Sequence, residues 1–374
     1  MARATLRVGV LGAGAWALAA HIPGWQRDPR CEVATVCDVV PERAEQAAAR
    51  FGIADAQHDW QAVVARPDLD VIDIATPSAT HHELALAALA EGKHVLCEKP
   101  VAYDFRDTLA AAELAQRKGV LTKVGLTFRY TPGMQYARAL IEEGFVGQPF
   151  FFNGYEQNSQ WLDPATPLRQ VDHTADPSVL QTSSLEGYGA PIIDIGMWWV
   201  GAPYAACVGT MRNFIPQRMV RATGRMMRMN IDDGDIHLVE YANGALGSIQ
   251  TSFVTIGNYP GVEARIYGSK GAIICRAVEE FGVAETMRVA TADQVEFRPV
   301  EIPQRFYPAG GTPRESWRSL FYANLIRDFI DEILAGTGRN QGNFEDGARV
   351  QEVINAVELS HRERRWVSLP LPRR

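Results

Sequence analysis

The sequence lacks any apolar run that is long enough to cross a lipid bilayer. Spanning the hydrocarbon core takes about 18 or more uninterrupted apolar residues, and the 374-residue chain contains no run of that length. It also lacks a surplus of positive charge, since 37 lysines and arginines stand against 44 aspartates and glutamates, for a net charge of −7. We therefore expect no membrane span, and nucleic acid is not an expected partner.

Cysteine is scarce and forms no recognisable motif. The five cysteines are scattered along the chain, and neither a CxxC pair nor an HExxH run occurs. Structural disulfides belong mainly to oxidising compartments, so we expect free thiols and a cytoplasmic location. His81-His82-Glu83 lacks the spacing of metal ligands, and no metal is predicted.

The clearest motif that is present is a glycine-rich turn between a strand and a helix. The apolar run Leu6–Leu11 predicts a strand, and Gly12-Ala13-Gly14-Ala15-Trp16-Ala17 follows it directly and matches GxGxxG/A. Gly12 permits the tight turn, and Gly14 lets the backbone approach a pyrophosphate. The first turn of the helix predicted for 17–25 would hold the phosphates through its amides and its dipole.

An acidic residue follows the next predicted strand. A second strand is predicted for 32–37, and Asp38 follows it, about twenty residues beyond the glycine turn. A carboxylate at this place accepts hydrogen bonds from both ribose hydroxyls of NAD and repels the 2′-phosphate of NADP. The spacing therefore predicts a dinucleotide site that prefers NAD to NADP.

The first third of the chain alternates between apolar strands and helices. This alternation predicts a doubly wound parallel sheet of the Rossmann type over 1–126. The expected strands, after the two already named, cover 71–75, 94–97 and 120–126, and the expected helices cover 41–51, 80–90 and 105–118.

From residue 127 onward the pattern changes, and 127–374 is predicted to be an α+β domain with a large, mainly antiparallel open sheet. The segment 158–186 shows little periodicity, and a loop of that length is usually functional or disordered. Asn243-Gly244 is a hairpin turn signal between two expected strands. Strands are expected at 150–157, 235–241, 245–253, 262–267 and 272–275, and helices at 132–143, 191–200, 317–334 and 345–361.

A lysine stands directly after the apolar run His94–Cys97, in the tripeptide Glu98-Lys99-Pro100. Lys99 is therefore expected at the carboxyl end of a parallel strand, where open α/β sheets bind their ligands. Burial and a nearby cationic nicotinamide would both lower its pKa, which makes Lys99 a candidate proton carrier. Pro100 would fix the backbone just past it, and an X–Pro bond at such a site can be cis.

Together these motifs resemble the glucose-fructose oxidoreductase / inositol dehydrogenase family (Gfo/Idh/MocA). The resemblance runs from Leu6 to the C-terminus. It implies an NAD-dependent dehydrogenase or reductase that transfers a hydride between nicotinamide and a carbinol or carbonyl carbon of a sugar, inositol or related polyol. It also implies a homodimer or homotetramer, since the outer face of the open sheet often forms a subunit interface in this family. The residues that carry it are Gly12-Ala13-Gly14, Asp38, Ala75-Thr76-Pro77, His81, Glu98-Lys99-Pro100, Arg129-Tyr130, Asp194-Ile195-Gly196 and Phe344-Glu345-Asp346-Gly347.

The resemblance also assigns residues to the cofactor. His81 can contact the cofactor or can simply begin a helix, and Arg129 can face the site or form a structural ion pair. Thr127 stands where the family often has asparagine. The predicted cofactor-binding residues are Gly12, Ala13, Gly14, Ala15, Trp16, Asp38, Arg43, Ala75, Thr76, Pro77, His81, Glu98, Lys99 and Arg129.

The candidate catalytic segment departs from the family pattern. Family members typically carry Asp-x-Gly-x-His, whereas here the sequence is Asp194-Ile195-Gly196-Met197-Trp198. The i,i+4 spacing places Asp194 and Trp198 on one face of a helix. Indole donates a hydrogen bond but does not titrate in this range, so Trp198 cannot relay a proton.

Three interpretations of this departure stay open. In the first, Lys99 carries the proton, Asp194 orients the substrate hydroxyl and Trp198 stacks on a sugar ring. In the second, Tyr188 supplies the hydroxyl group of the acid/base. In the third, redox chemistry is lost and the protein only binds NAD. Two other function classes stay open: an enzyme without net redox turnover that has a glycosidase-like internal redox cycle on tightly bound NAD, and a non-catalytic NAD-binding regulatory protein.

Aromatic and amide side chains gather after the strand expected at 150–157. Rings can cover the C–H faces of a polyol while amides such as Gln157 and Asn158 pair with its hydroxyls. An ordinary strand edge followed by a polar loop is the alternative. The predicted substrate contacts are Lys99, Tyr155, Trp161, Asp194 and Trp198, and Arg169, Asp172 and His173 are candidates for a lid or for a contact with a neighbouring subunit.

Overall fold

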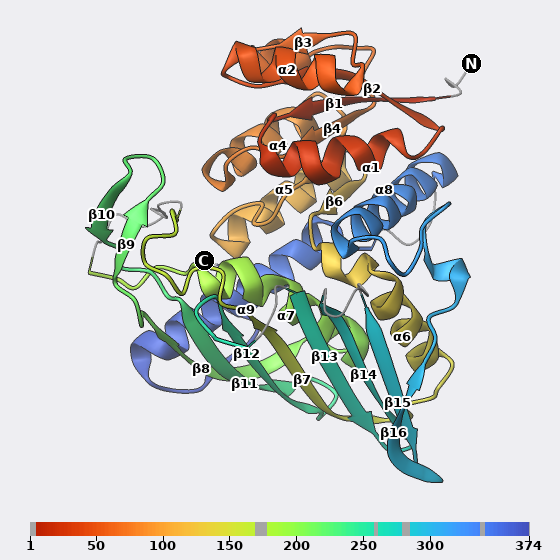
Figure 1. The fold of residues 1–374 in the computed structure, drawn as a ribbon, viewed down its shortest axis with the longest axis vertical. Helices are drawn as coiled ribbons and strands as arrows, with labels where there is room; N and C mark the ends of the chain where they lie inside the picture. The colour runs from red at the N-terminus through yellow and green to blue at the C-terminus, as the bar shows by residue number, and fades with distance from the viewer. Residues whose placement is uncertain (1–4, 169–177, 258–260, 279–284, 337–340, 374) are drawn as a thin grey trace. The chain divides into compact units, whose positions relative to one another are not determined.

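The computed structural model describes residues 5–168, 178–257, 261–278, 285–336 and 341–373, which form two compact units (Figure 1). Unit 1 comprises Met1–Tyr130 together with Arg318–Gln351, and unit 2 comprises Thr131–Trp317 together with Glu352–Arg374. The lid candidates Arg169, Asp172 and His173 lie outside the described residues.

A six-stranded parallel sheet forms the centre of unit 1 (Figure 1). Its order is β3-β2-β1-β4-β5-β6, so the chain runs outward from β1, returns to β4 and runs outward on the other side. The predicted doubly wound sheet is therefore confirmed, with its switch point between β1 and β4, where such sheets bind ligands. The strands are β1 (Leu6–Leu11), β2 (Cys31–Cys37), β3 (Ala56–Gln57), β4 (Val71–Ile74), β5 (His94–Cys97) and β6 (Thr122–Val124).

Some helices of unit 1 begin and end where the sequence supplies caps, and α5 (Phe105–Lys118) is the clearest case. The side chain of Asp104 accepts a hydrogen bond from the Arg106 amide at the start of α5, and Gly119 ends that helix in the left-handed conformation. The helix expected at 17–25 is a π-helical turn, η1, followed by α1. The elements are η1 (Ala17–His21), α1 (Ile22–Gln26), α2 (Pro41–Phe51), α3 (Trp60–Val64), η2 (Ser78–Thr80), α4 (His81–Ala90), α5 (Phe105–Lys118), η3 (Thr127–Tyr130), α8 (Trp317–Ala335) and the first part of α9 (Phe344–Glu363), which continues into unit 2 after Gln351.

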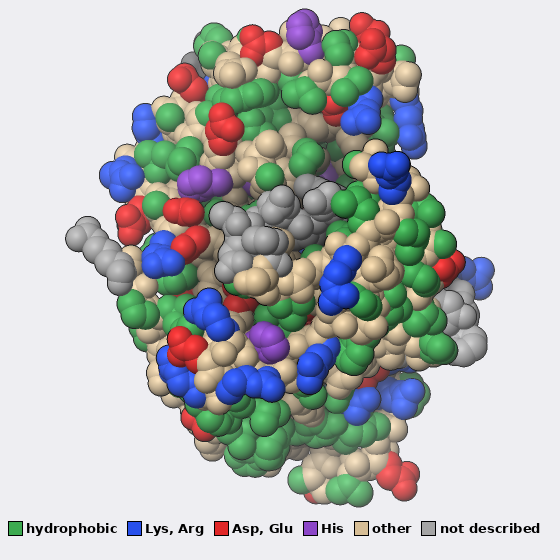
Figure 2. Space-filling view, turned by 90° about the vertical axis from the view of Figure 1, so that its left-hand side faces the viewer, with side chains coloured by type: hydrophobic (Ala, Val, Ile, Leu, Met, Phe, Trp, Pro, Cys, Tyr) green, Lys and Arg blue, Asp and Glu red, His purple; other side chains and the backbone are tan. Residues whose placement is uncertain are grey.

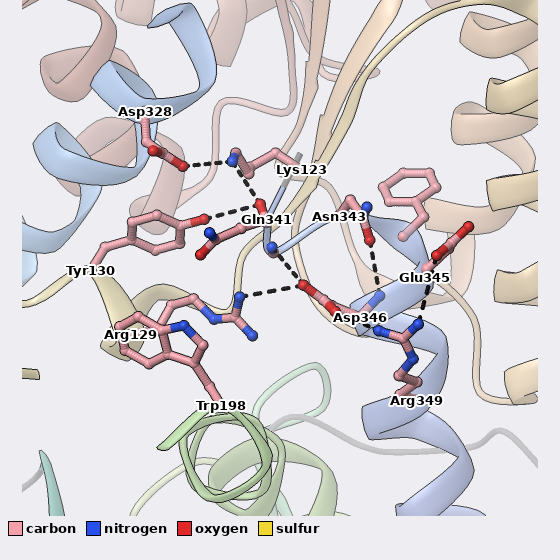
Figure 3. Close-up of polar contacts among 12 residues, drawn as sticks. Lys123, Arg129, Tyr130, Trp198, Asp328, Gln341, Asn343, Glu345, Asp346 and Arg349 are labelled. Atoms are coloured by element: carbon pink, nitrogen blue, oxygen red, sulfur yellow. Dashed lines mark hydrogen bonds and ion pairs between the residues drawn. The ribbon is translucent and has the colours of Figure 1, made fainter. Parts of the chain in front are cut away.

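The segment Arg318–Gln351 packs within unit 1, whereas the division of the sequence into 1–126 and 127–374 placed it in the second domain. Lys123 of β6 holds it there. The fully buried Lys123 Nζ lies 2.7 Å from Asp328 Oδ2 and 2.8 Å from Glu332 Oε2, both on α8, and it donates to the Gln341 carbonyl at 2.6 Å (Figure 3). A buried ammonium needs such partners, and they lie about two hundred residues away along the chain.

A nine-stranded sheet forms the centre of unit 2, in the order β16-β15-β14-β13-β7-β12-β11-β8-β17. Its pairs are antiparallel except for β7 and β12, so the predicted mainly antiparallel sheet is confirmed. The strands are β7 (Pro149–Gln157), β8 (Tyr204–Arg212), β11 (Gly234–Tyr241), β12 (Leu246–Ser252), β13 (Gly261–Gly268), β14 (Gly271–Val278), β15 (Thr286–Thr291), β16 (Gln294–Val300) and β17 (Val367–Ser368).

The two faces of this sheet differ. Helix α7 packs on one face against β7 and β13, where the absence of a side chain at Gly154 makes room for Ile192. The opposite face exposes Phe151, Leu238 and Leu246, each close to half. The remaining elements of unit 2 are α6 (Pro132–Glu142), the π-helical turn η4 (Leu185–Gly189), α7 (Ala190–Val200), η5 (Gln304–Phe306) and the hairpin of β9 (Gln217–Val220) with β10 (Arg225–Arg228).

The sequence did not predict the β9–β10 hairpin. All four residues of β10, Arg-Met-Met-Arg, are exposed, so its sequence carries no apolar alternation that could mark a strand. Figure 2 looks onto the side of the molecule that carries this hairpin and shows Lys and Arg side chains gathered in the lower half of the view.

The close approach at Gly154 gives a test of the packing in unit 2. A Cβ at this position would overlap the Ile192 side chain, so Gly154→Val is expected to lower the free energy of unfolding by about 1–3 kcal/mol, the usual effect of overpacking a core. Urea denaturation measures it. Gly187→Ala is the control, because no atom lies within 4 Å of its Cβ position; equal stability of the two variants would contradict this packing.

Candidate active site

The glycine loop lies at the switch point of the parallel sheet. Gly12 follows β1 with φ at 101°, and a Cβ there would lie 2.6 Å from the Ala75 carbonyl oxygen, so a larger residue would strain both the turn and the neighbouring loop. At Gly14 no atom lies within 4 Å of the Cβ position. The backbone at Gly14 is therefore open to a ligand, and these residues fit a dinucleotide pyrophosphate.

Asp38 lies beside this loop at the end of β2. Its carboxylate accepts hydrogen bonds from the Ala13 amide and from the Val40 amide, both at 2.9 Å. The structure therefore brings the predicted ribose-binding carboxylate to the predicted phosphate loop. Arg43, from the same predicted set, is exposed near the start of α2.

His81 joins two loops at the carboxyl edge of the sheet. The buried ring places Nδ1 2.8 Å from the Pro100 carbonyl oxygen and Nε2 2.9 Å from the Thr76 carbonyl oxygen. Thr76 belongs to the loop after β4, and Pro100 follows Lys99. His81 therefore braces the Ala75-Thr76-Pro77 loop against the Glu98-Lys99-Pro100 loop.

Lys99 stands directly after β5, as the sequence predicts, and the Lys99–Pro100 peptide bond is cis. Its backbone N–H donates to Glu98 Oε2 at 3.3 Å. The other carboxylate oxygen of Glu98 accepts from the Trp16 indole at 3.1 Å, so Glu98 links the lysine to the glycine loop. Burial alone would raise the pKa of Glu98, but hydrogen bonds and charge from His21 outweigh it and lower that pKa to about 2.

Arg129 is buried in η3 and forms a structural ion pair. Its Nη1 lies 3.3 Å from Asp346 Oδ2, which also accepts from the Gly342 amide at 2.7 Å (Figure 3). The other oxygen of Asp346 accepts from Arg349 at 3.0 Å. The sequence mark Phe344–Gly347 therefore begins α9 and supplies the carboxylate that holds Arg129.

In unit 2, α7 carries both Asp194 and Trp198. Asp194 is buried, with 1% of its surface exposed, and Trp198 is half-buried. Arg138 of α6 donates to the Trp198 carbonyl and places its guanidinium carbon 5.8 Å from the centroid of the indole. A guanidinium over an indole face is attractive, so Trp198 is held on the surface of α7 by its neighbouring helix.

Tyr188 and Trp161 lie together in an aromatic cluster. Their ring centroids are 6.4 Å apart, and both rings contact Phe253. The Tyr188 hydroxyl donates to Gln160 Oε1 at 2.9 Å. The structure therefore brings together two of the predicted site residues that the sequence listed under different roles.

Tyr155 lies on the other face of the sheet. Side chains alternate along a strand, and because Gly154 faces α7, Tyr155 faces away from it. The guanidinium carbon of Arg265 lies 5.4 Å from the Tyr155 ring centroid, and both residues line a pocket of about 290 Å³. The structure therefore does not bring Tyr155 to the face that α7, with Asp194, covers.

A buried acidic cluster lies beside η4, the turn that precedes α7, and was not predicted from the sequence. Asp232 accepts hydrogen bonds from the amides of Ser183, Ser184 and Leu185, where the chain enters η4. Asp233 pairs with fully buried Arg218 at 2.8 Å. The run Asp232-Asp233-Gly234-Asp235 was the available signal, but acidic runs are more often exposed turns.

The described part of the chain offers no helix that is both long and apolar enough to cross a membrane. Over the same residues, no group of three or more histidine, cysteine, aspartate or glutamate side chains is placed to hold a metal ion.

Comparisons with known proteins agree with this geometry. Residues 6–126 match the model of the oxidoreductase family with an NAD-binding Rossmann fold, and residues 134–274 match the GFO/IDH/MocA C-terminal domain. Levoglucosan dehydrogenase of Pseudarthrobacter phenanthrenivorans is 28% identical over 351 residues, which cover 90% of this chain and 89% of that protein. The scyllo-inositol 2-dehydrogenase (NAD(+)) of Bacillus subtilis is 26% identical over 66% of each chain.

Solved structures are similar over nearly the whole chain. Levoglucosan dehydrogenase in complex with NADH and L-sorbose has a TM-score of 0.87 at 27% identity, covering 98% of this chain and 99% of that one. An oxidoreductase domain protein from Kribbella flavida has a TM-score of 0.88 at 26% identity, covering 99% and 100%.

A substitution at Arg129 can distinguish a structural role of this residue from a contact with the cofactor. Arg129→Met is expected to lower the free energy of unfolding by about 1–3 kcal/mol, since it removes a charged hydrogen-bond donor from Asp346, and to leave the NAD dissociation constant within about twofold. Chemical denaturation and cofactor titration measure the two effects. Native stability combined with a tenfold weaker affinity for NAD would instead make Arg129 a cofactor contact.

Proposed function

Because this chain belongs to the Gfo/Idh/MocA oxidoreductase family, we propose that it moves a hydride between NAD and a carbinol or carbonyl carbon of a sugar, inositol or related polyol. The observation that carries the proposal is the position of Lys99. It follows β5 at the carboxyl edge of the same parallel sheet whose β1 and β2 are followed by the glycine loop and Asp38. One unit therefore carries both the dinucleotide-binding residues and a candidate proton carrier.

The cofactor site is assigned residue by residue. Gly12 and Ala13 would form the turn of the phosphate loop, with their amides bonded to the Cys37 carbonyl and to Asp38. Gly14 would let the backbone approach the pyrophosphate, and the amides at the start of the first helix would donate to it. Asp38 would accept the ribose hydroxyls and disfavour NADP. The loop after β4, braced by His81, and the glycine loop frame the rest of the cofactor.

Lys99 is proposed to move the proton. The nicotinamide of NAD would accept the hydride when the cofactor is bound. Lys99 Nζ would take the hydroxyl proton during oxidation and return it during reduction. In its protonated form the ammonium would stabilise negative charge that develops on the substrate oxygen. Asp194 would orient the substrate hydroxyl from α7.

Trp198 is proposed as a rigid surface for the substrate. Arg138 from the neighbouring helix donates to the Trp198 carbonyl and lies over the indole, which favours one orientation of the ring. An aromatic face suits the C–H face of a sugar ring. Tyr188 remains the alternative source of an acidic hydroxyl, and its bond to Gln160 shows that the group is engaged with a polar partner.

A second candidate function rests on the same tryptophan. Because Trp198 replaces the histidine of the family pattern, the chain can be an NAD-binding protein without net redox turnover, either with an internal redox cycle or with a regulatory role. Tight retention of NAD through purification, without turnover on any polyol, would favour that reading.

The assembly and the location are proposed as well. The outer face of the unit 2 sheet exposes Phe151 and Leu246, which are directly paired neighbours on β7 and β12, and Leu238 on the next strand. An apolar face of this kind marks an interface, and we assign it to a homodimer or homotetramer. Five free cysteines, four of them buried, fit the reducing cytoplasm.

The role of Lys99 is tested by following nicotinamide absorbance with aldoses, uronic acids, inositols and anhydro-sugars. Lys99→Ala is expected to lower kcat by about 10²–10⁴-fold, the usual contribution of general acid–base catalysis, with little change in NAD affinity. Lys118→Ala, on the surface of α5, is the control. Native turnover in Lys99→Ala would remove the lysine from the mechanism.

The choice of cofactor is tested at Asp38. Asp38→Ala is expected to improve kcat/KM for NADP relative to NAD by about tenfold or more, which corresponds to about 1.4 kcal/mol of lost discrimination. The physical reason is the loss of repulsion toward a 2′-phosphate. If the native protein uses NAD and NADP equally well, the assignment of Asp38 is wrong.

A further inference from the structure

Glu98, next to Lys99, has partners from three different parts of unit 1, and Gly125 from a fourth part makes room for it. Its Oε1 accepts from the Trp16 indole at 3.1 Å and from the Tyr322 hydroxyl of α8. His21 Nε2 lies 3.4 Å from the same oxygen. Gly125, after β6, leaves the space for this carboxylate, since a Cβ there would lie 2.6 Å from Oε1.

A second carboxylate, that of Asp73, bonds to the other ring nitrogen of His21. His21 Nδ1 is 2.9 Å from Asp73 of β4, and the Trp25 indole donates to Asp73 at 2.7 Å. The side chains of His21 and Asp73 are completely buried. The ring of His21 packs on that of Tyr322, with centroids 4.3 Å apart and the hydroxyl 2.7 Å from Nε2.

The hydrogen bonds around His21 are all satisfied when the imidazole carries two protons. The single hydroxyl proton of Tyr322 is donated to Glu98, so the Tyr322 oxygen accepts from Nε2–H of His21. The carboxylate of Asp73 only accepts, so Nδ1 of the same ring must donate as well. The charge of this imidazolium is balanced by the two carboxylates that flank it.

The electrostatics agree with this arrangement. Burial would lower the pKa of His21, but the charge and hydrogen bond of Asp73, with those of Glu98, outweigh burial and raise it to about 9. The ionisable groups that face the ring are Asp73 from β4, Glu98 after β5 and Tyr322 from α8, and the charge of Lys99 lies beyond Glu98. The ring is therefore cationic at neutral pH, and it keeps Glu98 ionised.

We propose that Asp73 and His21 are positioning residues for Lys99, acting through Glu98. Glu98 Oε2 accepts from the backbone N–H of Lys99, and Oε1 accepts from Trp16 in the glycine loop. Holding Glu98 therefore fixes the catalytic lysine relative to the loop that binds the cofactor. This inference rests on the proposed role of Lys99, and neither Asp73 nor His21 touches the reacting atoms.

The sign of the pH dependence follows from the imidazolium. Below the raised pKa of about 9 the ring keeps both protons and supports Glu98; as the pH rises through that value the support is lost. Asp73→Asn removes the larger attractive charge, so His21 loses its proton at a lower pH. The alkaline loss of kcat should then begin at lower pH in this variant than in the native protein.

The experiment compares Asp73→Asn with the isosteric Tyr322→Phe, and uses Thr108→Val, a buried substitution on α5, as the control. Each variant is assayed for kcat across pH, for NAD affinity, for thermal stability and for the titration of His21 by NMR. Asp73→Asn is expected to lower kcat about tenfold to a hundredfold through misplacement of Lys99, to leave NAD affinity within about threefold, and to move the His21 titration from about 9 toward lower pH.

Tyr322→Phe keeps the ring volume and removes only the bridging hydroxyl, so it tests the same point if Asp73→Asn does not fold. A native kcat and pH profile in these variants, or a neutral His21 at pH 7 in the native protein, would overturn the proposal. The double variant Lys99→Ala/Asp73→Asn should be no slower than Lys99→Ala, because the two act as one unit. Full activity in Lys99→Ala alone would instead overturn the function of the lysine, which separates the two failures.

Discussion

The hydrogen-bond network around the Glu98 carboxylate, whose side chain is only 15% exposed, is the interaction on which the rest of unit 1 depends. A buried charge is costly unless it is paired and hydrogen-bonded, and Glu98 obtains its partners from the glycine loop, from η1 and from α8. The three elements are therefore drawn to one point at the carboxyl edge of the sheet. Lys99 follows Glu98 in the chain, so the partners that hold Glu98 also fix the backbone position of the candidate proton carrier.

The arrangement explains why α8 belongs to the dinucleotide-binding unit. Tyr322 closes the network around His21 and Glu98, while Lys123 binds Asp328 and Glu332 further along the same helix. The contacts of Tyr322 and of Lys123 both enclose charged groups. In both, the paired residues lie about two hundred or more positions apart in the chain. A division of the sequence by local composition cannot see such pairs, which is why the predicted boundary at 126/127 left this segment in the other domain.

Local patterns were sufficient for the parallel sheet, the glycine loop and the position of Lys99, because each depends on a short strand and the residues beside it. They were insufficient for the faces of the second sheet. Alternation puts Tyr155 and Gly154 on opposite faces, but only the packing of Ile192 on Gly154 decides which face α7 covers. His21, which keeps Glu98 ionised, was not predicted for a similar reason. Its partner Asp73 lies 52 residues away along the chain, on β4.

The proposed mechanism requires Lys99 to carry the proton in a family member that has Trp198 in place of the usual histidine. The most direct measurement is a single-turnover experiment, in which enzyme in excess over NAD is mixed with each class of polyol and the nicotinamide absorbance is followed. We expect the native protein to form NADH in a single turnover with one substrate class, and Lys99→Ala to form it with none at a comparable rate. Firm binding of NAD with no NADH formed from any class would contradict it and would leave Trp198 as the mark of a protein that binds the cofactor without net redox turnover.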